Sequence, residues 1–283
     1  MATALAKKEI KKQSLSAVCS ALASARLPLV RAAEIIADDR RESAVQTPGE
    51  SASPSVVSPL NAAGLHDIAG DAYADFAAAF GFTLAAAHQA AEARGKPLFI
   101  CEQIISQADQ GALYGPGLAH FGIAPDRIII ASVRSEQDLL WCAEEALACG
   151  GLGAVVLRLS PREKKYAFTP SRRLHLRAIE AGVPAFVVRG SPARAATAAE
   201  SLWRVGARPS KPVSPFVARA AAKRILGEAR ALARLERARA TPPASYELGW
   251  SCEEKNRKRK SGALRLDLAV PLADGLAVAN DAG

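Results

Sequence analysis

Short apolar segments alternate with helix-length segments through the middle of this chain, and this alternation restricts its fold more than any other feature. Strands are expected at 64–70, 96–101, 126–132, 153–160 and 183–190, with one more inside 197–208. The helices expected between them cover 75–95, 117–122, 136–151 and 171–182. Apolar strands separated by helices are typical of a mostly parallel sheet with helices on its faces. The sequence therefore predicts an α/β core.

The regions that flank this core have a different composition. Residues 1–42 are rich in Ala and Leu with scattered charges, which predicts a helical segment interrupted at Pro28. Residues 43–60 combine prolines with serines and predict a flexible linker. The core is then expected to span 61–212, followed by a C-terminal extension over 213–283.

The start of the C-terminal extension fits two structures. Residues 215–240 could form one helix with a row of arginines and a lysine along one face. Alternatively, a helix ends near Gly227, and residues 231–240 pair with residues 245–250 across the turn at Thr241-Pro242-Pro243. A Pro-Pro turn between two short segments favours the second structure.

Positive charge exceeds negative charge, and part of the excess is concentrated near the C-terminus. The net charge is +9, which favours a polyanion such as DNA or an acidic protein partner. The densest run is KNRKRK, with Lys255, Arg257, Lys258, Arg259 and Lys260, which suits phosphate or partner contacts as well as it suits a solvated loop.

Other arginines are weaker candidates for a contact surface. Arg172 and Arg173 open a predicted helix, where positive charge opposes the helix dipole, so a DNA- or partner-binding role is considered for both. Arg189 and Arg204 lie near strand ends, where ligands bind in α/β folds, but a surface position is the simpler interpretation.

The cysteines and the apolar segments indicate a cytoplasmic protein. The five cysteines are irregularly spaced without a CxxC pair, so neither a zinc site nor a disulfide framework is expected, and reduced, mostly buried thiols are. No apolar run has the length of a signal peptide core or a membrane helix.

The turn where a nucleotide-binding α/β fold holds phosphate lacks the residues for that task. Such a turn follows the first strand and needs glycines, a lysine and a Ser or Thr. The matching turn at 70–77 has one glycine, Gly70, no lysine, and the carboxylates of Asp71 and Asp75. These carboxylates would repel a triphosphate, and we expect them to cap the following helix instead.

The position that would hold a metal ion is also altered. The strand at 153–160 offers Arg158, with no Asp or Glu before Glu163. Because both halves of the site are changed, we expect no ATP hydrolysis, no cofactor and no metal. Glu102 follows a buried strand and could position water, but a hydrogen-bonded structural carboxylate is the preferred interpretation. The four histidines lie in separate predicted elements and suggest no catalytic set.

The order of these segments resembles the ImuA family of damage-inducible mutagenesis proteins, which are related to RecA and SulA. The pieces that carry the resemblance are LYGPGLAHFGI, WCAEEAL and the helix that begins SRRL, and the likeness covers about residues 64–210. It implies a RecA-like core in which Gly70–Ala77 lies where the phosphate loop would be. It also places Glu102 at the catalytic glutamate position and Arg158 at the magnesium-binding aspartate position.

The resemblance implies a role in the SOS response. ImuA acts in translesion synthesis with ImuB, an inactive polymerase relative, and with an error-prone polymerase. We therefore expect a non-catalytic factor that contacts an ImuB-like protein, an error-prone polymerase or RecA. Two alternatives stay open, a DNA-binding RecA-like repair protein and a SulA-like cell-division inhibitor. Contact with DNA is considered possible, either directly or through the complex.

Overall fold

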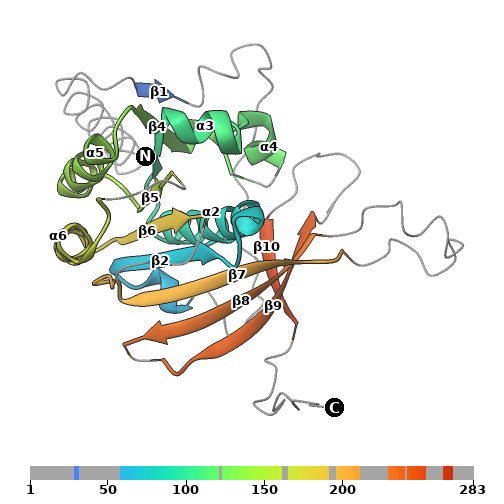
Figure 1. Ribbon diagram of the computed structural model, residues 1–283. Coiled ribbons are helices and arrows are strands. Elements are labelled where there is room, and N and C mark those ends of the chain that lie inside the picture. Colours follow the sequence, from blue (N-terminus) through green and yellow to red (C-terminus); the bar gives the residue numbers. More distant parts are fainter. Residues whose placement is uncertain are drawn as a thin grey trace, which may run out of the picture.

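A single ten-stranded sheet runs through the computed structural model (Figure 1). The strand order is β1-β4-β3-β5-β6-β2-β7-β8-β9-β10. The structure describes residues 29–31, 58–120, 123–160, 165–190, 196–210, 229–239, 241–252 and 264–269.

The centre of the sheet consists of six parallel strands. They are β2 (Gly64–Gly70), β3 (Leu98–Gln103), β4 (Ile128–Val133), β5 (Ala154–Arg158), β6 (Pro184–Arg189) and β7 (Ser201–Arg208). All six coincide with predicted strands. The predicted fold class is confirmed as an α/β fold with a mostly parallel sheet flanked by helices.

Both edges of the sheet are antiparallel. The strands there are β1 (Leu29–Arg31), which pairs with β4, and β8 (Ala229–Ala238), β9 (Ala244–Cys252) and β10 (Leu264–Ala269), which follow β7. The predicted pairing across Thr241-Pro242-Pro243 is confirmed by the register of β8 and β9. The sheet therefore continues well past residue 212, where the core was expected to end.

Two predictions for the N-terminal region are wrong where the structure describes it. Leu29–Arg31, expected inside a helical segment, extends the sheet as strand β1. Residues 58–60, expected in the flexible linker, belong to a 3-10 turn, η2 (Ser58–Asn61), whose Leu60 is fully buried in the core. The rest of both regions lies outside the described residues.

The helices lie in layers against the parallel strands. Helix α2 (Phe76–Ala93) covers one face of the sheet, and α5 (Glu136–Ala148) and α6 (Phe168–Ala181) cover the other (Figure 1). Two shorter helices, α3 (Ile104–Gln110) and α4 (Gly115–His120), follow β3. Helix α3 was not predicted, since that stretch was expected to be a loop. Two 3-10 turns complete the set, η3 (Tyr73–Asp75) and η4 (Pro125–Arg127).

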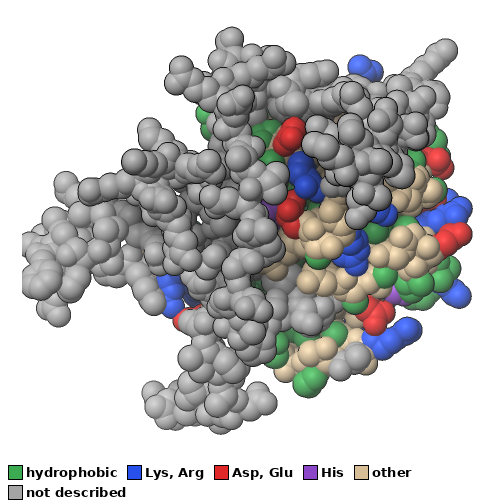
Figure 2. Space-filling view, turned by 180° about the vertical axis from the view of Figure 1, so that it is seen from behind, with side chains coloured by type: hydrophobic (Ala, Val, Ile, Leu, Met, Phe, Trp, Pro, Cys, Tyr) green, Lys and Arg blue, Asp and Glu red, His purple; other side chains and the backbone are tan. Residues whose placement is uncertain are grey.

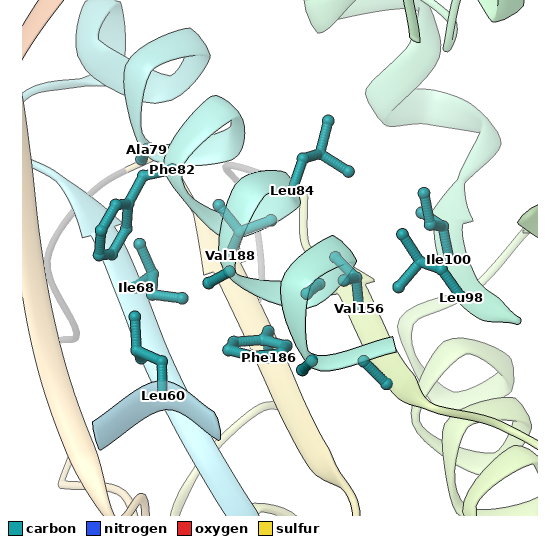
Figure 3. Close-up of a cluster of buried hydrophobic side chains, with 14 of the residues drawn as sticks. Leu60, Ile68, Ala79, Phe82, Leu84, Leu98, Ile100, Val156, Phe186 and Val188 are labelled. Carbon is teal, nitrogen blue, oxygen red and sulfur yellow. The ribbon is translucent and has the colours of Figure 1, made fainter. Parts of the chain in front are cut away.

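The two cores follow from the alternation of side chains along each strand. Ile68, Ile100, Val156 and Val188 point to the α2 face, where they pack with Phe82 and Leu84 of that helix (Figure 3). The neighbouring residues in the same strands point to α5 and α6 and include Leu65, Phe99, Leu157 and Val187. Because both faces are covered, most residues of these strands are apolar, and their few polar side chains are buried with them.

Helix α2 approaches the sheet closely near its C-terminal end because most of its buried residues are alanines. Ala79, Ala86, Ala87 and Ala90 are fully buried there. At the closest point, a Cβ placed on Gly153 would lie 2.6 Å from Ala91 Cα, so only glycine fits before β5.

Candidate functional site

The carboxyl ends of the parallel strands are where ligands bind in open α/β sheets. Strands β2, β3, β5 and β6 end there at Gly70, Gln103, Arg158 and Arg189. In this chain, that edge carries two buried ion pairs, one on each face of the sheet, and a groove beside α2.

The turn after β2 uses its two carboxylates within the fold. Asp71 forms an ion pair with Arg234 of β8. Asp75 Oδ2 accepts a hydrogen bond from the Ala72 amide at 3.0 Å, and its Oδ1 accepts one from the Ala207 amide at 2.9 Å. Asp75 occupies the N-cap position of α2, as expected, but its carboxylate accepts no hydrogen bond from that helix. The prediction that Asp71 caps α2 is wrong, because Asp71 pairs with Arg234. The turn is instead joined to β7 and β8.

Arg158 and Glu102 form a buried ion pair at the centre of this edge. They are direct neighbours across β5 and β3, and each points to the α2 face, since Val156 and Ile100 two residues earlier do. Arg158 Nη1 lies 2.7 Å from Glu102 Oε2, and each side chain is 2% exposed. Two residues that the sequence separates by more than fifty positions are thus placed together by strand order.

The remaining polar atoms of this pair have partners too. Arg158 Nε donates to Gln110 Oε1 at 3.2 Å, and Nη2 donates to the Gly111 carbonyl at 2.9 Å. Glu102 Oε1 accepts from Gln107 Nε2 at 2.7 Å. These bonds join α3 and the residue after it to the sheet. The Glu102 carboxylate is therefore a hydrogen-bonded structural group, which is the interpretation that the sequence favoured.

The guanidinium of Arg158 also lies against two aromatic rings of α2. Its central carbon is 5.4 Å from the Phe76 ring centroid and 5.3 Å from that of Phe80. Contacts of this kind stabilise a desolvated cation. Positive charge is therefore present at the sheet edge, but it is enclosed by a carboxylate, carbonyl oxygens and aromatic rings.

A second buried ion pair, Asp67 with Arg189, lies on the α5 and α6 face. Arg189 Nη2 is 2.6 Å from Asp67 Oδ2, which also accepts from Thr197 Oγ1 at 2.8 Å. The Arg189 guanidinium lies 4.8 Å from the Tyr166 ring centroid. The prediction of a surface position for Arg189 is wrong, because its side chain is 2% exposed. The signal was Asp67 itself, since a carboxylate inside an apolar strand requires a buried partner.

A mostly apolar groove of about 320 Å³ opens between α2 and residues 110–118 together with Ile123; we call it the α2 groove. Phe76, Phe80 and Leu84 of α2 line one wall. Leu113, Tyr114, Leu118 and Ile123 line the other, and Arg158 lies at its polar end. No sequence pattern indicated this groove, because its second wall depends on how α3 and α4 fold back toward α2.

The described contacts do not bring the basic residues that the sequence singled out to this edge of the sheet. Arg172 is exposed in α6, and Arg173 pairs with Glu144 of α5 at 2.5 Å. Helix α6 begins at Phe168, so both arginines lie beyond its first residues. Arg204 pairs with Glu236 at 2.8 Å in the antiparallel part of the sheet. The KNRKRK run from Lys255 to Lys260 lies outside the described residues.

Charges of both signs are nearly balanced over the described residues, so most of the basic excess belongs to the rest of the chain. Figure 2 shows this on one face, where Lys and Arg side chains alternate with Asp and Glu among the coloured residues.

Two of the histidines are buried and uncharged. His66 Nε2–H donates to the Ala62 carbonyl at 3.0 Å, and Nδ1 lies 2.8 Å from Ser201 Oγ. Burial lowers the pKa of His66 to about 4. His175 Nδ1 accepts from the Leu65 amide at 3.2 Å, and burial lowers its pKa as well. Both have structural partners, and the Ser201 hydroxyl beside His66 is buried and also accepts a hydrogen bond from Trp203 Nε1 at 3.0 Å.

Two of the described cysteines are buried, as expected. Cys101 and Cys142 are buried and free, and Cys149 is free and half-buried. Within the described ranges, no three His, Cys, Asp or Glu side chains gather in a way that could bind a metal ion. No helix in those ranges has the length and apolar character that crossing a membrane requires.

Comparison with known proteins adds little to this description. No family model matches the chain, and a search of curated proteins gave no match. Among solved structures, SulA from Pseudomonas aeruginosa is similar at 15% identity and a TM-score of 0.34, over 44% of this chain and 96% of the SulA chain. This likeness is too small to assign a function.

Proposed function

We propose that this chain is a non-catalytic accessory factor of SOS-induced mutagenesis and translesion DNA synthesis in the cytoplasm. It acts through protein contacts with an ImuB-like protein, an error-prone polymerase or RecA, as its resemblance to the ImuA family implies. The observation that supports a non-catalytic role is the buried pair of Arg158 and Glu102 at the edge where a RecA-like protein binds nucleotide.

A nucleotide site needs an anion cradle and a carboxylate that is free to hold a metal ion or orient water. In this chain the carboxylate of Glu102 is engaged by Arg158 and Gln107. Removing Arg158 from that contact would leave a buried negative charge, which costs about 3–5 kcal/mol. Triphosphate binding would have to supply that free energy before any chemistry began.

The turn from Gly70 to Ala77 supports the same proposal. Asp71 and Asp75 lie where phosphate oxygens would approach, and each is fixed by contacts to β7 or β8. Like charges in a partly desolvated turn oppose anion binding. The sheet edge is therefore built to be stable without a ligand.

The test is association of the purified chain with an ImuB-like protein, the error-prone polymerase and RecA, each measured separately by size-exclusion chromatography. We expect a stable complex with at least one of them, unchanged by ATP and magnesium. Failure of the chain to associate with all three would overturn the proposal. ATP hydrolysis that disappears in Glu102→Gln would overturn the non-catalytic part.

A DNA-binding role is the second candidate, favoured by the five positive charges of the KNRKRK run. It predicts binding that falls steeply with salt and weakens when Lys255, Arg257, Lys258, Arg259 and Lys260 are replaced by Gln. Equal binding by the two proteins would exclude that run as the contact.

A further inference from the structure

Strands β7 and β8 carry a group of arginines on the face of the sheet opposite to the one that α2 covers. We call this group the arginine face, and its members are Arg204, Arg208, Arg230, Arg234 and Arg237. Alternating residues of the same strands, such as Trp203 and Leu235, point into the core beneath α2 instead. On the side of the arginine face, α5 and α6 pack on β2 to β6, and β7 and β8 extend beyond them (Figure 1).

Four of these arginines form two pairs that lie directly opposite each other across the two strands. Arg204 is opposite Arg234, and Arg208 is opposite Arg230. Side chains at directly opposite positions have Cβ atoms about 5 Å apart, and like charges there destabilise a sheet. Two such pairs between the same two strands indicate that this charge serves a purpose other than stability.

Carboxylates neutralise only part of the arginine face. Three of them each pair with one arginine, Asp71 with Arg234, Glu236 with Arg204 and Glu247 with Arg230. Five arginines against three carboxylates leave a local charge of +2. The paired side chains are 25–41% exposed, and ion pairs with that exposure contribute only about 0–1 kcal/mol. A ligand with negative charge can therefore share or replace these contacts at small cost.

The guanidinium groups also keep donors for a ligand. Each of the three paired arginines reaches its carboxylate through a single nitrogen, and Arg237 donates Nη2 to two backbone carbonyls. Arg208 is exposed and has no partner among the residues that the structure describes. A guanidinium has five N–H donors in a planar fork that fits the oxygens of a phosphate group.

The chemistry of the arginine face favours nucleic acid over protein. Protein interfaces are centred on buried apolar or aromatic anchors, and sites for single-stranded nucleic acid use aromatic rings on which bases stack. The one aromatic residue of β7 and β8, Trp203, points into the core, and Leu232 between the arginines is buried. Guanidinium groups without such anchors suit the sugar-phosphate backbone of a duplex.

We infer that the arginine face binds the backbone of duplex DNA without reading its sequence. Along β7 the two opposed pairs are four residues apart, which is about 13 Å at about 3.3 Å per residue. Several phosphates of one DNA strand lie within that length, at about 3.4 Å of helix axis each. The site is separate from the KNRKRK run, and it does not depend on the protein contacts proposed above.

The probe is a fluorescein-labelled DNA duplex of about 20 base pairs, added to the full chain and followed by anisotropy between about 50 and 200 mM salt. We expect saturable binding that falls steeply as the salt concentration rises and is equal for duplexes of unrelated sequence. Absence of saturable binding at the lowest salt concentration would overturn the inference.

Arg208→Glu tests the face directly. It should weaken binding of every duplex severalfold and lower the slope of log affinity against log salt by about 1. Arg134→Glu is the matched control, because Arg134 is also exposed and follows β4, at the opposite end of the parallel strands from β7. It changes the net charge equally and should leave binding nearly unchanged. An equal loss in both variants would show that only the total charge matters.

The stability of Arg208→Glu distinguishes a binding role from a structural one. The new carboxylate lies opposite Arg230, so an attractive pair replaces a repulsive one. The midpoint of thermal unfolding should therefore rise while DNA binding weakens. A variant that binds DNA as well as the unchanged chain does would remove Arg208 from the contact and contradict the inference.

Two other outcomes would assign the binding elsewhere. If replacement of the KNRKRK charges by Gln abolishes duplex binding and Arg208→Glu does not change it, that run holds the DNA and the inference is wrong. If a polyglutamate peptide binds in an Arg208-dependent manner and the duplex does not bind, the face serves an acidic protein and the inference is also wrong. Arg208→Glu should still form the protein complexes proposed above, so the two proposals can fail separately.

Discussion

At the scale of single residues, the two buried ion pairs carry the most information. Asp67 with Arg189 and Glu102 with Arg158 place four charges inside the sheet, each with further hydrogen bonds. A buried pair is strongly destabilised by removal of one partner and much less by replacement of both with apolar residues.

Arg158→Met tests this. It leaves Glu102 buried and unpaired, so we expect the free energy of unfolding to fall by about 3–5 kcal/mol, measured by urea denaturation. The double variant with Glu102→Met should recover part of that loss, because no charge is left buried. If the double variant loses as much free energy of unfolding as Arg158→Met and Glu102→Met lose together, then Arg158 and Glu102 are not energetically coupled.

His66 predicts a specific acid sensitivity. Its pKa rises from about 4 in the folded chain to the ordinary 6.5 on unfolding, so the unfolded state binds the extra proton between these values. Its contribution to stability is therefore complete above pH 6.5 and is lost as the pH falls toward 4. The difference corresponds to about 3 kcal/mol.

The measurement is the free energy of unfolding between pH 7 and pH 4 for the unchanged chain and His66→Gln. Glutamine can hydrogen bond to Ser201 or Ala62 but does not titrate. The variant should lose less stability over this range, and parallel curves would show that His66 is not responsible.

Residue roles were the least predictable part of the site. Arg158 and Glu102 were identified as altered positions, but their contact required the register of β5 beside β3. Arg189 was misplaced because a strand-end arginine gives no sign of a carboxylate that lies 122 residues away in sequence. Asp67 inside an apolar strand was the clue that pointed to a buried pair.

At the scale of elements, close packing of α2 on the sheet depends on glycine before β5. Gly153→Ala would place a Cβ 2.6 Å from the Ala91 backbone. We expect a loss of about 1–3 kcal/mol, as for overpacked cores. Gly249→Ala is the control, since nothing lies within 4 Å of its added Cβ. Equal midpoints of thermal unfolding for the two variants would contradict the described packing.

Elements with strong periodicity were predictable, and the short ones were not. The six parallel strands follow from apolar segments, and the pairing of β8 with β9 follows from its Pro-Pro turn. Helix α3, seven residues without a side-chain cap, has no sequence signal of its own and is joined to the sheet by Arg158. Strand β1 exists through its pairing with β4, a tertiary contact that local sequence does not encode.

At the scale of the whole molecule, the described fold and the basic excess belong to different parts of the chain. The sheet and its helices carry nearly balanced charge, while the KNRKRK run lies elsewhere in the sequence. A mostly parallel sheet whose carboxyl edge holds the buried pair of Arg158 and Glu102 suits the proposed role of a protein that acts by contact. The core would then supply the docking surface, and the basic run would add affinity for DNA or for an acidic partner.

The central claim is that the sheet edge does not bind nucleotide. Isothermal titration of ATP with magnesium into the purified chain tests it most directly. We predict no saturable heat at millimolar ATP, because the carboxylate of Glu102 and the guanidinium of Arg158 already satisfy each other. Saturable binding that weakens in Arg158→Met or Glu102→Gln would contradict the claim and restore a nucleotide site to this fold.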